Sequence, residues 1–96
     1  MFDTNDLAML DSEYFTIIYK DIYDVTIKSN NTGHYWQLHN PEYPTPGQVI
    51  IFHAHSGHIP YHLHGRAGSL RQAVRSIQSH DRWQLKGRPK RKKGNE

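Results

Sequence analysis

The chain has 96 residues, enough for one domain with a single hydrophobic core. It contains no cysteine, which excludes disulfides, thiolate metal ligands and thiol nucleophiles and leads us to expect a cytoplasmic protein. No run of about 18 apolar residues and no apolar segment near the N-terminus is present, so we expect neither a membrane span nor a secretion signal.

The formal net charge of +3 is unevenly distributed along the chain. Residues 1–24 carry six acidic side chains and one basic one, whereas residues 66–93 carry ten of the twelve Lys and Arg residues and one acid, Asp81. An acidic first part and a basic last part favour a polyanionic partner for the C-terminal region.

The predicted elements begin with a short helix over residues 3–12, capped by Thr4 or Asn5. From Glu13 the apolar pattern has a period of two, which predicts strands at 14–20, 24–29 and 34–39, with a turn at residues 30–33. Residues 40–48 contain three prolines and a glycine and are expected to form a loop. Two more strands are predicted at 49–55 and 60–66, joined by a turn over residues 56–60.

A helix is predicted over residues 69–80, because Ser69 and Gln72 form a capping box ahead of an amphipathic pattern. The apolar positions of that pattern are Leu70, Ala73, Val74 and Ile77. Trp83 and Leu85 are expected to pack near the end of the helix, while Gly87 and Pro89 prevent its continuation. The predicted fold class is therefore α+β. We expect an antiparallel sheet of four or five strands with one C-terminal helix packed on one face, in a single domain over residues 1–85. Residues 86–96 would form a flexible basic tail.

Five of the eight histidines fall between residues 53 and 64, in the run HAHSGHIPYHLH. Two pairs, His53 with His55 and His62 with His64, have the spacing H-x-H. Alternate residues of a strand share one face, so a hairpin would bring all four imidazoles together.

The same alternation assigns the strand residues to two faces of the sheet. The residues expected against the helix are Val25, Ile27, Trp36, Leu38, Ile50, Phe52, Ala54, Tyr61 and Leu63. The residues expected on the solvated face are Thr26, Lys28, Tyr35, Gln37, His39, His53, His55, His62, His64 and Arg66. Both tryptophans, Trp36 and Trp83, are expected in the core.

The histidine pattern leaves three interpretations open. The first is a metal site, since imidazole suits Zn or Ni, and its ligands would be His53, His55, His62 and His64. No Asp or Glu lies in residues 43–80 to orient metal-bound imidazoles, so the sequence predicts no metal or other cofactor. The second is contact with phosphates or bases, and the third is the plain polar side of an amphipathic sheet.

We favour the second interpretation, which predicts a small, non-enzymatic nucleic-acid-binding module and leaves RNA and DNA equally open. The expected contacts on the sheet are Lys28, Tyr35, Gln37, His39, His53, His55, His62, His64 and Arg66. Those on the helix are Arg71 and Arg75, with Arg82 extending the same positive surface. Those in the tail are Lys86, Arg88, Lys90, Arg91, Lys92 and Lys93.

The order of short motifs resembles that of HicA-type toxins, small mRNA interferases with a fold like that of double-stranded-RNA-binding domains. The corresponding segments are Thr32-Gly33-His34 leading to His39-Asn40-Pro41, then VIIFHAH, then Gly68-Ser69-Leu70-Arg71-Gln72-Ala73. The resemblance covers residues 25–80 and implies His34 as a catalytic histidine. The first alternative function is thus a metal-independent endoribonuclease using His34 with His39, His53 or Arg66. The second is a protein-interaction module that inhibits or adapts a nucleic-acid enzyme.

Overall fold

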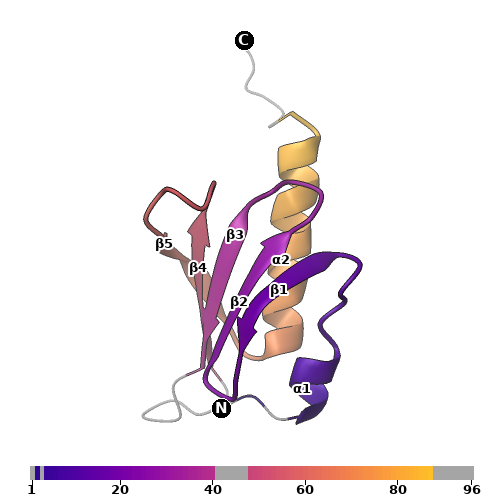
Figure 1. The fold of residues 1–96 in the computed structure, drawn as a ribbon, viewed down its shortest axis with the longest axis vertical. Helices are drawn as coiled ribbons and strands as arrows, with labels where there is room; N and C mark the ends of the chain where they lie inside the picture. The colour runs from indigo at the N-terminus through magenta and orange to yellow at the C-terminus, as the bar shows by residue number, and fades with distance from the viewer. Residues whose placement is uncertain (1, 3, 41–47, 88–96) are drawn as a thin grey trace.

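The computed structural model describes residues 2, 4–40 and 48–87, which form one five-stranded sheet and two helices (Figure 1). The strands are β1 (Phe15–Lys20), β2 (Asp24–Ser29), β3 (Tyr35–His39), β4 (Val49–Ala54) and β5 (His62–Ala67). The helices are α1 (Thr4–Ala8) and α2 (Leu70–Leu85). Neighbouring strands pair antiparallel in the order β1-β2-β3-β4-β5, which confirms the predicted α+β class.

Helix α2 lies across one face of the sheet, as Figure 1 shows. Its start is fixed as predicted, because the Ser69 hydroxyl accepts a hydrogen bond from the Gln72 amide at 3.1 Å. The Gln72 side chain in turn accepts from the Gly68 amide at 2.9 Å. The helix runs five residues beyond the predicted end at residue 80, to Leu85. It stops at Gly87, whose φ of +80° favours glycine.

The predicted faces are confirmed for β2 and β3, where Val25, Ile27, Trp36 and Leu38 are buried in the core. Ala54 is buried as expected, but the face predicted for the rest of β4 is wrong: Val49 and Ile51 are in the core, and His53, expected in solvent, is only 2% exposed. The apolar run over residues 49–52 fits a strand in either phase, so alternation within β4 could not decide which residues face inward. The pairing of Trp36 with His53 across β3 and β4 decides it.

The prediction for β5 fails together with that for β4, because Leu63 pairs with Phe52: Leu63, expected in the core, is 55% exposed. Between Ile51 and Phe52 the pairing partner shifts from Gly65 to Leu63, which leaves His64 as an extra, bulged residue.

Trp83 was also placed wrongly, since it is 45% exposed, and Leu85 is exposed as well. Both lie on the last turns of α2, beyond the part that the sheet covers.

Several predicted features lie outside the described residues. These are most of the loop, at residues 41–47, and the tail cations Arg88, Lys90, Arg91, Lys92 and Lys93. Lys86, at the end of α2, is described and exposed. Within the described ranges, neither helix is long and apolar enough to cross a membrane.

Candidate functional site: an imidazole cluster between the sheet and α2

One row of paired residues across the sheet changes from apolar side chains to imidazoles. Ile27 of β2 pairs with Trp36 of β3, Trp36 pairs with His53 of β4, and His53 pairs with His62 of β5. The His53 ring stacks on the Trp36 indole, with ring centroids 4.1 Å apart and an interplanar angle of 24°. His53 therefore continues the core of the sheet toward its β5 edge, under helix α2, whereas His62 at that edge is exposed.

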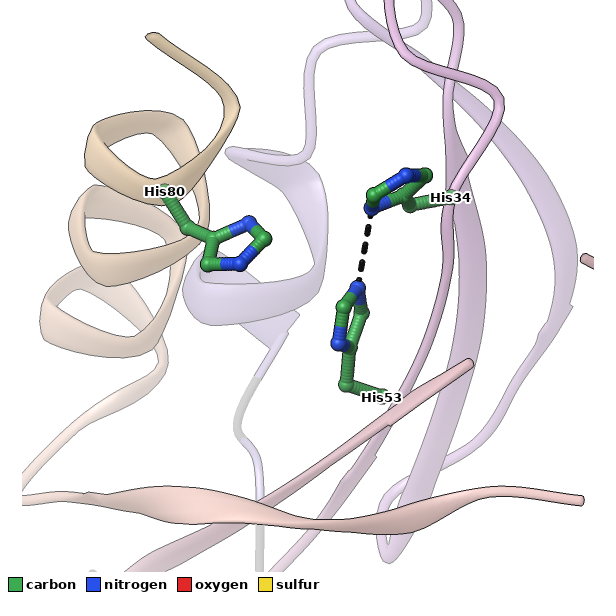
Figure 2. A group of neighbouring side chains, drawn as sticks. All are labelled: His34, His53 and His80. Atoms are coloured by element: carbon green, nitrogen blue, oxygen red, sulfur yellow. Dashed lines mark hydrogen bonds between the residues drawn. The ribbon is translucent and has the colours of Figure 1, made fainter. Parts of the chain in front are cut away.

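Three imidazoles from separate parts of the chain converge at this place (Figure 2). His34, at the entrance to β3, and His53, on β4, approach with Nδ1 of the former 3.0 Å from Nε2 of the latter. His80 reaches toward them from α2, as Figure 2 shows. One ring nitrogen from each residue lies within 4.8 Å of the other two. We call His34, His53 and His80 the inner triad.

A hydrogen-bond network centred on Asp81 fixes the inner triad. Asp81 is fully buried, and its carboxylate accepts from the Tyr14 hydroxyl at 2.8 Å and from the Thr32 hydroxyl at 3.1 Å. The same Thr32 oxygen accepts from the His34 amide at 3.3 Å. Because Asp81 follows His80 directly, this network joins the α2 side of the triad to the turn that carries His34.

The other three imidazoles of the cluster lie outside the triad, and we call His55, His62 and His64 the outer ring. Their ring centroids lie 4.9, 5.3 and 5.7 Å, respectively, from that of His53. His55 and His62 are exposed, whereas His64 is half-buried. The cluster is therefore closed toward Trp36 and open toward the β5 edge.

Burial favours the neutral form of two inner imidazoles, those of His53 and His80. Burial lowers the pKa of His53 to about 3, and the neighbouring imidazoles contribute to the shift. Burial is also the largest cause of the lowered pKa of His80, which nearby His64 and His34 lower further while Asp81 opposes them. The buried Nδ1 of His80 has no hydrogen-bond partner among the described residues. A neutral imidazole has a lone pair on one of its two ring nitrogens, so His53 and His80 can each offer one to a metal ion.

The structure separates the predicted site residues into two groups. All four histidines of the H-x-H pairs belong to the cluster, on the face that α2 covers. The other site residues that were predicted on the strands, Lys28, Tyr35, Gln37, His39 and Arg66, lie on the uncovered face of the sheet. There Lys28 Nζ is 5.9 Å from the centroid of the Tyr35 ring, and His39 Nδ1 lies 2.8 Å from the Asp24 carboxylate. Gln37 and Arg66 are also exposed. Of the three partners expected for catalytic His34, only His53 lies beside it.

Sequence reasoning missed His80, although a signal for it was present. Residues 73, 77 and 80 follow the helical spacing of the apolar stripe, so the helix predicted over residues 69–80 already places His80 on its covered face. No sequence pattern, however, relates His80 to His34, which is 46 residues away.

The opposite side of α2 carries a row of cations. Arg71, Arg75, Arg82 and Lys86 are all exposed, and we call them the cationic side of α2. The only acidic residue of this helix is Asp81, which is buried. An exposed helix side with four positive charges and no negative charge is suited to a polyanion.

Comparisons with protein-family models, with curated proteins and with solved structures give no match to this chain. The resemblance to HicA-type toxins therefore stays a prediction, and the function has to be argued from the geometry of the described residues.

Proposed function

We propose that this chain is a metal-binding protein that holds a zinc ion between His34, His53 and His80. The observation that carries the proposal is the convergence of three ring nitrogens within 4.8 Å, from two strand regions and a helix. In a tetrahedral site with Zn–N bonds of about 2.0–2.1 Å, two ligand nitrogens lie about 3.3 Å apart. The 3.0 Å between His34 Nδ1 and His53 Nε2 is close to this value, and the His80 nitrogen, within 4.8 Å of both, would move inward to complete the set.

The chemistry of the donors favours zinc over harder ions. The triad offers only neutral nitrogen, which suits Zn, Ni and Cu, whereas Mg and Ca prefer carboxylate and carbonyl oxygen. The single acidic group nearby, Asp81, is already bound to Tyr14 and Thr32. It acts on the site by holding the backbone next to His80, as supporting residues of zinc sites do.

Three protein ligands leave the fourth position of a tetrahedral ion for water or another ligand. Because imidazoles bring no negative charge, the bound ion retains its full double positive charge. Such an ion strongly acidifies a bound water and attracts anionic oxygens. The arrangement is the type used by zinc enzymes and distinguishes this site from closed structural zinc sites.

The proposal is tested by equilibrium dialysis of the full chain against Zn²⁺, with metal content measured in the retained protein. The wild type should bind one tight equivalent, and His80→Asn should bind at least about 100-fold more weakly because one of three ligands is removed. His58→Asn is the matched control, since His58 is an exposed histidine in the connection between β4 and β5. Equal zinc binding by wild type and His80→Asn would disprove the proposed site.

A second candidate function is nucleic-acid binding, which the cationic side of α2 favours. The four exposed cations lie on one long element without an exposed acid, and the sequence continues into the basic residues 88–93. The sequence assigned the main contact to the sheet. The structure places its histidines under α2, so the helix is the better candidate.

Mobility-shift titrations with RNA and DNA distinguish these two surfaces. One triple variant, Arg71→Gln with Arg75→Gln and Arg82→Gln, removes three charges from the helix. Its matched control, Lys20→Gln with Lys28→Gln and Arg66→Gln, removes three charges from the strands. For the helix variant, the plot of log K against log salt concentration should be less steep by about 0.9 for each phosphate that the protein no longer neutralises. The control variant should leave the slope unchanged. An equal effect of both variants would contradict binding through α2.

A further inference from the structure

A cavity of about 350 Å³ lies between helix α2 and the segment that leads into β1, and it shares no residue with the imidazole cluster. This volume is near the lower end of the range for small-molecule sites, so the cavity suits a ligand of metabolite size. Its lining combines apolar side chains with two arginines, an aspartate and a glutamine. We propose that it binds a free apolar amino acid, a function separate from the zinc site.

The buried part of the lining is apolar. Phe15 of β1 and Val74 of α2 belong to the hydrophobic core, and Met9 packs against that core while half-buried. An aliphatic group of a ligand placed here would contact these side chains and lose its contact with water, which favours binding. The apolar residues therefore provide a place for a short aliphatic side chain.

The α2 wall of the cavity is positively charged. Arg71 and Arg75 are four residues apart, so they leave the helix on one side with about 5–6 Å between their Cβ atoms. Both are exposed, and neither makes an ion pair with any other described residue. Because a guanidinium group can bind a carboxylate through two parallel hydrogen bonds, this pair is suited to the carboxylate of a ligand.

The other wall carries one negative charge, that of Asp11. One of its carboxylate oxygens accepts from the Glu13 amide at 2.9 Å, and its backbone carbonyl accepts from the Phe15 amide at 2.8 Å. These bonds hold Asp11 at the cavity while its second carboxylate oxygen has no hydrogen bond to the described part of the chain. A fixed carboxylate with an available oxygen is suited to an ammonium group.

The two walls together select a ligand that carries both charges. A purely anionic ligand would be repelled by Asp11, and a purely cationic one by the two arginines. A molecule with a carboxylate, an ammonium group and a short aliphatic chain matches both walls and the apolar lining at once. A free amino acid with an aliphatic side chain, such as leucine, has these three parts.

The cationic side of α2 supplies a matched control for this site. Of its four described cations, Arg71 and Arg75 line the cavity, whereas Arg82 and Lys86 lie further along the helix. Arg82→Gln therefore removes the same charge from the same helix without changing the cavity. Glu13→Gln is the corresponding control for Asp11, since Glu13 is an exposed acid two residues away.

The test is isothermal titration calorimetry of the full chain in EDTA, which keeps the proposed zinc site free of metal. The probes are L-leucine, isocaproate, which is leucine without its amino group, and isoamylamine, which is leucine without its carboxylate. L-Leucine should bind with a Kd of about 1 mM or below. Each of the other two probes should bind at least about tenfold more weakly, because one charged hydrogen-bond partner is lost.

Two variants connect each wall with one end of the ligand. Asp11→Asn keeps an oxygen that can accept from the Glu13 amide, and it should weaken the binding of L-leucine at least about tenfold without weakening that of isocaproate. Arg75→Gln should likewise weaken the binding of L-leucine but not that of isoamylamine. A change that only disturbed the fold would affect all three probes alike. Both control variants should bind L-leucine as the wild type does.

Three results would overturn the proposal. The first is that L-leucine, L-valine and L-phenylalanine all fail to bind at concentrations up to about 10 mM. The second is that the three leucine-like probes bind equally well, because the charged walls would then select nothing. The third is that Arg82→Gln weakens L-leucine binding as much as Arg75→Gln does, because general charge attraction would then explain the binding.

Discussion

Replacing His80 with leucine should stabilise the metal-free protein and remove its metal site at the same time. The His80 Nδ1 atom is buried without a hydrogen-bond partner among the described residues, and an unsatisfied buried polar atom costs about 1–3 kcal/mol. Leucine removes this atom, fills a similar volume beside Trp36 and His53, and favours the helical conformation slightly more than histidine does.

We expect a net gain of about 1 kcal/mol in the free energy of unfolding, corresponding to an increase in Tm of about 4–8 °C for a domain of this size. Zinc should reverse which of the two proteins, the wild type or His80→Leu, has the larger free energy of unfolding. At a free concentration of about 100 times Kd it stabilises the wild type by about 2.7 kcal/mol and the variant not at all. The wild type should then be the more stable protein by the difference, about 1.7 kcal/mol.

The assay is urea unfolding followed by tryptophan fluorescence, in EDTA and in excess Zn²⁺. Ser79→Leu, at the preceding exposed position of α2, controls for the helix preference of leucine. The reasoning is refuted if His80→Leu is less stable than the wild type in EDTA, because the imidazole would then be stabilised by interactions of its own. It is equally refuted if zinc stabilises both proteins to the same extent.

Three further predictions concern the surroundings of the triad. Tyr14→Phe removes a donor from the buried Asp81 carboxylate and should cost about 2 kcal/mol in urea unfolding. Zinc affinity, measured by dialysis, should fall by about tenfold, and an unchanged affinity would show that this network does not position His80. The stability of the metal-free protein should decrease as the pH falls below about 6.5, because the unfolded chain then binds a proton that folded His53, with a pKa of about 3, does not bind. This group contributes at most about 1.4 kcal/mol per pH unit, and a stability that is flat from pH 7 to pH 4 would contradict a neutral buried imidazole. His39→Gln, on the uncovered face, should leave zinc affinity unchanged, and a weaker affinity would argue that the site extends through the sheet.

Much of the fold could be predicted because its signals are local. The alternation over residues 24–29 and 34–39, with turn-forming residues between them, defines a hairpin that the structure confirms in its place and in the faces of its residues. The capping box at Ser69 likewise defines the start of α2. The end of α2 was less predictable. The apolar stripe stops at Ile77, and the last turns are held by Asp81, whose partners Tyr14 and Thr32 are remote in sequence.

The sequence by itself determined that the two histidines of an H-x-H pair lie on one side of a regular strand, since strand geometry imposes this on any such pair. Which side of the sheet they occupy was decided only by the tertiary structure. In β4 both sets of alternate residues are apolar enough to face a core, and pairing with Trp36 selects the set that contains His53. Packing of α2 then adds His80, and the turn before β3 adds His34. Their convergence brings three imidazoles from separate parts of the chain close enough together to suit a metal ion.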